Sequence, residues 1–139
     1  MPTTPQASAA DLPVRPGEEA WSDQELAEVR KELQTEAAEL RTEIEVTESQ
    51  IAERLGNSVQ DAGDDEADTG SKVYEREQEL ALTQRARDLL HQTERALERM
   101  KKGTYGACES CGQPIGKARL MAYPRAVLCV ACKQREERR

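Results

Sequence analysis

The chain has 139 residues, of which 37% are hydrophobic, 34% are charged and only 3% are aromatic. This length allows one small domain or two very small units, and the composition argues against a β-sandwich, a β-barrel or a deep apolar substrate pocket. The net charge of −7 gives no reason to expect general affinity for DNA. No apolar run approaches the ~18 residues of a membrane span and no secretory signal is recognisable, so we expect a cytoplasmic protein.

Charge divides the chain into two halves. Residues 1–71 carry a net charge of −13, whereas residues 72–139 carry +6. Opposite charge on two parts of one chain indicates two different partners, or one partner with two differently charged surfaces.

Residues 1–21 are predicted to form a disordered tail. Four of them are proline, and no periodic apolar pattern is present. This composition does not distinguish a tail that only solubilises the chain from a segment that binds a partner.

A first helix is predicted from about residue 23 to 55. Ser22 and Glu25 match a capping box, in which the hydroxyl and the carboxylate each accept a backbone N–H of the other residue. Arg30 interrupts the apolar seam. Gly56–Asn57 is a stop signal. The seam residues recur mostly at alternating steps of three and four: Leu26, Leu33, Ala37, Leu40, Ile44, Thr47 and Ile51.

A polar segment at about 56–70, here named the tip, connects this helix to a second one at about 68–102. The tip contains five acidic residues. Lys101, Lys102 and Gly103 end the second helix, because cations suit the negative end of the helix dipole and glycine suits a left-handed cap. Its predicted seam, which Leu82 and Leu89 widen, consists of Val73, Leu80, Leu90, Leu97 and Met100.

Two helices of roughly 30 residues joined by a short link favour an antiparallel hairpin over residues 22–102. An intermolecular coiled coil is the alternative. The fold class is therefore mainly α: a long antiparallel two-helix coiled-coil hairpin, followed by a small C-terminal globule at 103–139 that includes a C-terminal helix. We expect a monomer.

The four cysteines form two Cys-x-x-Cys pairs separated by 17 residues: Cys108, Cys111, Cys129 and Cys132. This is the ligand pattern of a tetrahedral zinc site, and the absence of an open coordination position predicts one structural ion rather than a catalytic one. Residues 103–139 are too few for a core of their own, so zinc binding, worth ~10–16 kcal/mol, is expected to supply the folding energy. Two disulfides and a thiol-based redox switch remain as alternatives.

The globule holds seven basic and three acidic residues. Because four thiolates and Zn²⁺ together add −2, its corrected positive excess is only about +2. No basic helix suited to base reading follows the second cysteine pair, so sequence-specific DNA binding is not expected. The chain shows no nucleophile–base pair or phosphate loop, and we do not expect an enzyme.

Residues 103–112, GTYGACESCG, resemble the signature of the DksA/TraR family. Further matches are Ile115-Gly116, Arg119-Leu120, Pro124 and Leu128-Cys129-x-x-Cys132-Lys133. The resemblance implies a zinc protein that binds bacterial RNA polymerase and inserts its hairpin into the secondary channel. It implies that the globule lies at the channel rim and that the tip lies near the catalytic metal, so that initiation changes without DNA contact.

The same resemblance assigns individual residues. The family's tip motif Asp-x-x-Asp-x-Ala matches Asp65, Asp68 and Gly70, with glycine in place of alanine. Without the resemblance, Asp68 reads as a helix N-cap. Arg85, Arg119 and Lys133 are candidate rim contacts.

Some family members share a guanosine tetraphosphate site with the polymerase, built from basic residues. Of those positions Arg85 and Lys133 remain basic, but two others hold Gln92 and Tyr123. Since the loss of two cations costs such a site most of its affinity, we expect little or no dependence on that nucleotide. Two other functions remain in play: a zinc-stabilised coiled-coil adaptor for another protein, and a thiol or zinc redox sensor.

Overall fold

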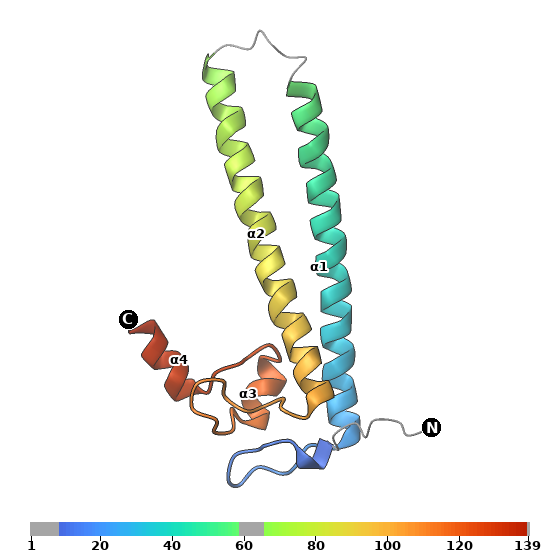
Figure 1. Cartoon of the computed structure of the whole chain (residues 1–139), viewed down its shortest axis with the longest axis vertical. Helices are drawn as coiled ribbons and strands as arrows, with labels where there is room; N and C mark the ends of the chain where they lie inside the picture. The colour runs from blue at the N-terminus through green and yellow to red at the C-terminus, as the bar shows by residue number, and fades with distance from the viewer. Residues whose placement is uncertain (1–8, 59–65, 139) are drawn as a thin grey trace. The chain divides into compact units, whose positions relative to one another are not determined.

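The structure, a computed structural model, describes residues 9–58 and 66–138. Over these residues the chain forms a 3₁₀ helix, η1 (Ala9–Asp11), and four α-helices: α1 (Asp23–Ser58), α2 (Glu66–Lys102), α3 (Lys117–Ala122) and α4 (Val130–Glu137). The described part contains an isolated β-bridge and no strand. The predicted helical hairpin is therefore confirmed, with α1 and α2 side by side (Figure 1). None of the described helices has an apolar stretch sufficient to cross a lipid bilayer.

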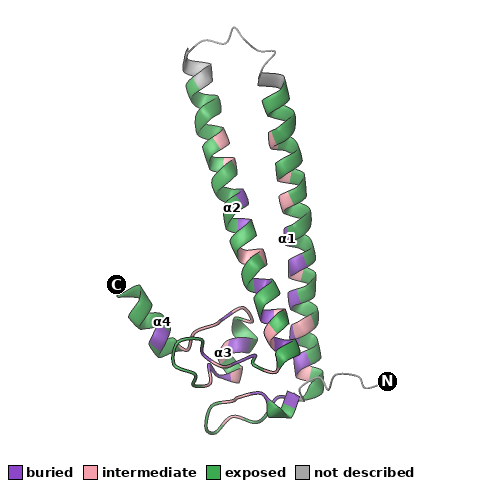
Figure 2. Cartoon of the chain, viewed as in Figure 1, coloured by how far each residue is buried: buried purple, intermediate pink, exposed green. Residues whose placement is uncertain are grey.

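The chain divides into two compact units. The first unit comprises Met1–Glu36 and Gln92–Arg139, and the second unit comprises Ala37–His91. Each long helix contributes to both units. Buried residues are concentrated in the first unit and are sparse in the second (Figure 2).

The start of α1 has the predicted capping box. The backbone N–H of Glu25 donates to the Ser22 hydroxyl over 3.0 Å, and the backbone N–H of Ser22 donates to the Glu25 carboxylate over 3.0 Å. Two backbone donors at the helix start are satisfied in this way.

The predicted stop at Gly56–Asn57 is wrong, since α1 continues to Ser58. Gly56 does not adopt the positive φ that a left-handed cap requires. A glycine inside a helix costs only about 1 kcal/mol relative to alanine, which helical continuity on both sides can offset.

The end of α2 is a Schellman motif. The N–H of Gly103 donates to the carbonyl of Met100 over 3.4 Å, and the N–H of Thr104 donates to the carbonyl of Arg99 over 3.0 Å. Gly103 has a φ of 77°, so the predicted left-handed glycine cap is confirmed. The helix begins at Glu66, slightly before the predicted residue 68.

The seam of α1 follows the predicted spacing with one change. Leu26, Leu33 and Leu40 are buried, but the position assigned to Arg30 is filled by Val29, which is 6% exposed. Val29 lies three residues after Leu26 and four residues before Leu33, so it continues the alternating spacing. The predicted interruption by Arg30 is therefore wrong.

The seam of α2 lies in a different register from the predicted one. Val73, Leu80 and Leu82 are 45%, 51% and 62% exposed, respectively. The predicted stripe had a gap of ten residues between Leu80 and Leu90, and the residues before and after this gap belong to different registers of the helix. Alternating steps of three and four instead connect the residues that the structure buries or half-buries: Thr83, Ala86, Leu90, Thr93, Leu97 and Met100.

The first unit holds the main hydrophobic core, and residues near the N-terminus belong to it. Ala9, Leu12 and Trp21 are only 2–3% exposed and pack in one cluster with Tyr105 and Leu120. The predicted disordered tail is therefore wrong for residues 9–21. The sequence shows no periodic pattern there because these residues are buried by contact with a distant part of the chain and not by a helix of their own. Residues 1–8 lie outside the described part.

Candidate metal centre and hairpin tip

The structure brings the four cysteines together. Their sulfur atoms all lie within 4.8 Å of one another, and the four thiols form no disulfide. Cys108 and Cys111 lie in the loop after α2, Cys129 is the N-cap of α4, and Cys132 lies in the first turn of that helix. Cys108 and Cys132 are buried, Cys129 is half-buried and Cys111 is exposed.

Backbone geometry positions the first cysteine pair. An isolated antiparallel bridge joins Ala107 and Pro114, and within it the N–H of Cys108 donates to the carbonyl of Gln113 over 2.8 Å. The N–H of Gly112 donates to the carbonyl of Cys108 over 2.9 Å. Gly112 has a φ of 76°, as expected for the left-handed residue that closes a Cys-x-x-Cys turn.

The sulfur positions fit a zinc ion. Four ligands at a Zn–S distance of ~2.3 Å in a tetrahedron lie roughly 3.8 Å from one another. The sulfurs of Cys111 and Cys129 are 3.8 Å apart, and none of the other pairs exceeds 4.8 Å. Closing the site around an ion therefore requires side-chain shifts of about 1 Å or less.

The electrostatics of the thiols also suit a cation. Burial raises the pKa of the Cys108 thiol, but hydrogen bonds from backbone N–H groups, that of Cys111 foremost, outweigh burial and lower it to about 6. A hydrogen bond with Ser110 lowers the pKa of Cys132, but the neighbouring sulfurs, led by Cys129, raise it to about 11. Mutual repulsion thus opposes four thiolates in this space, and a divalent cation among them removes that repulsion.

Two arginines of α2 hold the first cysteine loop. The Arg99 guanidinium is 14% exposed and donates to the carbonyls of Thr104, over 3.1 Å, and Ala107. The Glu109 carboxylate, inside the Cys-x-x-Cys sequence, forms ion pairs with Arg95 and Arg99. Sequence reasoning missed these contacts. The single available signal was the pair of arginines four residues apart near the end of α2.

The three predicted tip residues are described to different extents. Asp65 is not described. Asp68 lies in the first turn of α2, and its side chain is not described. Gly70 lies in α2 and is exposed, and a Cβ added there meets nothing within 4 Å. The tip role of these three residues therefore stays a prediction.

The candidate rim residues differ in their surroundings. Arg85 and Lys133 are exposed, as are Gln92 and Tyr123. Arg119 is half-buried, and its Nε is buried without a hydrogen-bond partner in the described structure. Arg119 is thus less accessible to a partner than the other two.

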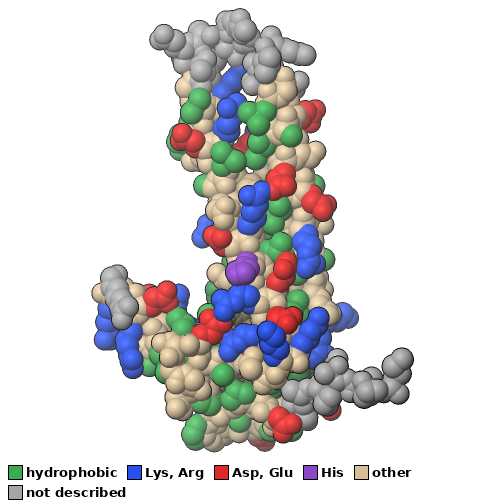
Figure 3. All heavy atoms as spheres, viewed as in Figure 1, with side chains coloured by type: hydrophobic (Ala, Val, Ile, Leu, Met, Phe, Trp, Pro, Cys, Tyr) green, Lys and Arg blue, Asp and Glu red, His purple; other side chains and the backbone are tan. Residues whose placement is uncertain are grey.

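The hairpin surface is charged on the face that Figure 3 shows, where basic and acidic side chains alternate along the helices. In the second unit, Arg54 pairs with Glu79, and Arg87 pairs with Glu48. These four residues are surface groups, so each pair contributes at most about 1 kcal/mol. The pairs link α1 to α2 across the seam and favour one register.

Known proteins resemble this chain over most of its length. Residues 103–138 match a family model described as the prokaryotic dksA/traR C4-type zinc finger. The RNA polymerase-binding transcription factor DksA of Caulobacter vibrioides is 35% identical over 127 residues, which cover 90% of this chain and 86% of that protein. The protein of the same name from Escherichia coli K12 is 34% identical over 119 residues, which cover 86% of this chain and 76% of that protein.

A solved structure resembles the fold as well. The structure of transcription factor DksA2 from Pseudomonas aeruginosa aligns with a TM-score of 0.66 at 33% sequence identity. The alignment covers 84% of this chain and 85% of that one. The similarity therefore extends well beyond the cysteine-containing segment.

Proposed function

The chain belongs to the DksA/TraR family, and from this membership we propose that it regulates transcription by binding bacterial RNA polymerase directly. The observation that carries the proposal is the sequence identity of 34–35% to polymerase-binding relatives over 86–90% of the chain. A match of this length extends over the hairpin, and the family model covers the cysteine cluster. A partner of this kind places the protein in the cytoplasm.

The proposed mode of action uses the two parts differently. The hairpin enters the secondary channel of the polymerase and brings the tip, with Asp65, Asp68 and Gly70, close to the active centre. Asp65 and Asp68 are three residues apart in the sequence, and their two carboxylates can meet cations or N–H donors of the polymerase. The regulator then alters initiation without sequence-specific contact to DNA.

The four cysteines are proposed to hold one structural zinc ion. When bound, zinc would act as a Lewis acid that accepts four thiolate ligands. Its binding would contribute folding energy to the small C-terminal segment. Cys108, Cys111, Cys129 and Cys132 fill a tetrahedral shell and leave no position for a substrate, so we assign the site no catalytic role.

Direct binding to core RNA polymerase tests the proposal. The zinc-loaded protein carries a fluorophore, and an unlabelled cleavage factor that occupies the secondary channel serves as competitor. Saturable binding that the competitor displaces is the expected result. Absence of binding up to tens of micromolar, weaker than ~6–7 kcal/mol, favours the alternative of an adaptor for another protein.

A variant pair separates binding from effect. Asp65→Asn combined with Asp68→Asn is expected to bind the polymerase nearly as the wild type does and to lose the effect on initiation, because the carboxylates act at the active centre. Asp61→Asn combined with Asp64→Asn removes the same charge from the same segment and is the matched control. Equal loss of binding and effect in the first variant contradicts this division of roles.

A further inference from the structure

Residues 9–22, named the strap here, cross the zinc-finger segment of the first unit. The side chains of Ala9, Leu12 and Trp21 are buried in the same core cluster as Ile115. The Trp21 ring lies 6.1 Å from the Tyr105 ring, centroid to centroid. The strap is therefore part of the core around the cysteine loops.

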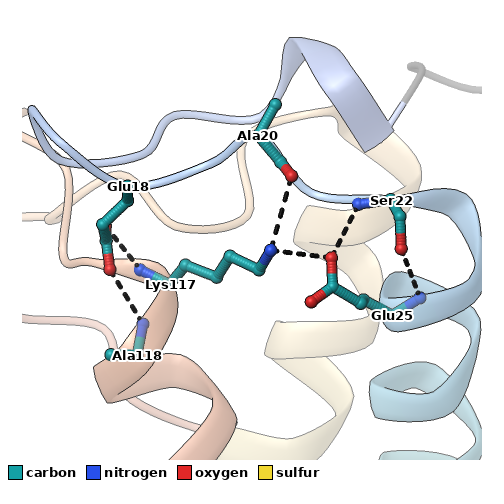
Figure 4. Close-up of polar contacts among 6 residues, drawn as sticks. All are labelled: Glu18, Ala20, Ser22, Glu25, Lys117 and Ala118. Atoms are coloured by element: carbon teal, nitrogen blue, oxygen red, sulfur yellow. Dashed lines mark hydrogen bonds and ion pairs between the residues drawn. The ribbon is translucent and has the colours of Figure 1, made fainter.

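One carboxylate fastens the strap to α3. Glu18 accepts the N–H of Lys117 on Oε1 and the N–H of Ala118 on Oε2, each over 3.0 Å (Figure 4). Gly116, the N-cap of α3, has no side chain with which to satisfy these donors. Glu18 therefore caps a helix that lies about one hundred residues further along the chain, and backbone N–H groups, that of Ala118 foremost, lower its pKa.

The Lys117 side chain also connects α3 to the start of α1. Its ammonium group donates to the Glu25 carboxylate over 2.7 Å and to the carbonyl of Ala20 over 3.4 Å (Figure 4). The same group lies 5.7 Å from the centroid of the Trp21 ring. The Lys117 side chain is 12% exposed and that of Glu25 is 29% exposed, so their ion pair is partly shielded from solvent.

The strap also forms one wall of a pocket beside the cysteines. Arg15 and Pro16 line this open pocket, about 620 Å³ in volume, together with Cys111, Cys129 and the buried Cys132. Cys111 and Cys129 are the two cysteines that burial protects least. Arg15 also packs against Gly116, because a Cβ added to Gly116 would lie 3.0 Å from the Arg15 Cδ.

We propose that the strap, fastened by Glu18, shields the Cys111–Cys129 face of the zinc site and slows loss of the ion. The inference rests on the proposed zinc site. Displacement of the strap removes Arg15 and Pro16 from the pocket wall and increases the access of solutes to the sulfurs of Cys111 and Cys129. Because zinc binding orders the loops to which the strap is fastened, the two events stabilise each other.

Zinc transfer from the full-length protein to a chromogenic chelator tests the inference. Glu18→Ala removes the cap of α3, and loss of a helix cap of typical strength corresponds to release about five- to tenfold faster than in the wild type. Glu19→Ala removes the same charge from the neighbouring exposed residue and is expected to release zinc at the wild-type rate. Glu18→Gln retains one acceptor and is expected to fall between the two.

Trp21 fluorescence provides a readout that does not depend on the chelator. In zinc-loaded Glu18→Ala, the emission of the only tryptophan is expected to shift to longer wavelength while the far-ultraviolet circular dichroism is retained. Equal release rates for Glu18→Ala and Glu19→Ala, in proteins that both contain zinc, overturn the strap proposal alone. Absence of zinc from the purified wild type overturns the zinc site and the strap proposal with it.

Discussion

Arg99 illustrates how one side chain of a helix positions a loop that follows it. Its guanidinium donates to two carbonyls of the segment leading into Cys108 and lies 3.7 Å from a Glu109 oxygen. Arginine suits this position because a planar group with several donors satisfies carbonyls and a carboxylate together. At the residue scale, the cysteine site thus depends on a residue nine positions before its first ligand.

Replacement of Arg99 tests this role. Arg99→Gln leaves the exposed Thr104 carbonyl and the part-buried Ala107 carbonyl with weaker partners and is expected to lower the free energy of unfolding by about 1–3 kcal/mol. Lys101→Gln removes one positive charge from an exposed position of the same helix and is expected to change it by less than about 0.5 kcal/mol. Urea denaturation of the zinc-loaded proteins measures both values, and equal values for the two variants would contradict the positioning role.

The proposed ligand Cys108 has a larger predicted effect. Cys108→Ser is expected to abolish stable zinc binding, to unfold the segment from 103 to 139 and to weaken polymerase binding, since the proposed ion contributes folding energy to this segment. Zinc content and the near-ultraviolet circular dichroism report the two structural changes. Thr104→Ser, at an exposed position of the loop after α2 and not a proposed ligand, is the control and is expected to retain the ion.

At the element scale, small residues decide how the two long helices meet. Thr83 and Ala86 are buried in the second unit, whereas the larger Leu80 and Leu82 are exposed. Small side chains at a seam allow two helix backbones to approach closely, and size therefore matters as much as hydrophobicity at these positions. The observed register of α2 is the one in which alternating steps of three and four residues continue without interruption from Thr83 to Met100.

Substitutions in the second unit distinguish the two registers. Ala86→Leu is expected to destabilise the hairpin by about 1–3 kcal/mol, because the added atoms overpack the seam. Ala81→Leu makes the same change at an exposed position of the same helix and is expected to have little effect. Leu80→Ala is expected to cost less than about 1 kcal/mol, and a cost in the range of about 2–5 kcal/mol would favour the register in which Leu80 is buried.

At the scale of the whole molecule, the hairpin and the cysteine cluster present different chemistry to a partner. The second unit has a shallow seam with few buried residues, and in the first unit the core surrounds the cysteine loops. Each unit therefore offers a partner a different kind of surface. The proposed binding to RNA polymerase uses both properties.

Nucleotide dependence belongs to this scale, because the site requires the partner. Gln92 and Tyr123 are exposed and uncharged where some family members carry cations, so guanosine tetraphosphate is expected to change the effect of this protein on initiation little or not at all. Titration of the nucleotide in a transcription assay measures the dependence. A large enhancement would contradict the prediction, and Gln92→Lys combined with Tyr123→Lys is expected to increase the response.

Features that depend on near neighbours in the chain were predictable from the sequence. The capping box at Ser22, the left-handed cap at Gly103 and the Cys-x-x-Cys turn at Cys108 each form within a few residues, so their side chains and backbone conformations leave a local signature. The α1 seam was predictable for the same reason, apart from the position of Val29. The two cysteine pairs lie close together in the structure, as their spacing in the sequence indicated.

Contacts between distant residues were decided only by the tertiary structure. Glu18 and Lys117 are 99 residues apart in sequence, and nothing near Glu18 shows that its carboxylate caps a helix. The burial of Trp21 and the register of α2 likewise depend on what packs against them, because a side chain with several local options takes the one that its neighbours in space stabilise.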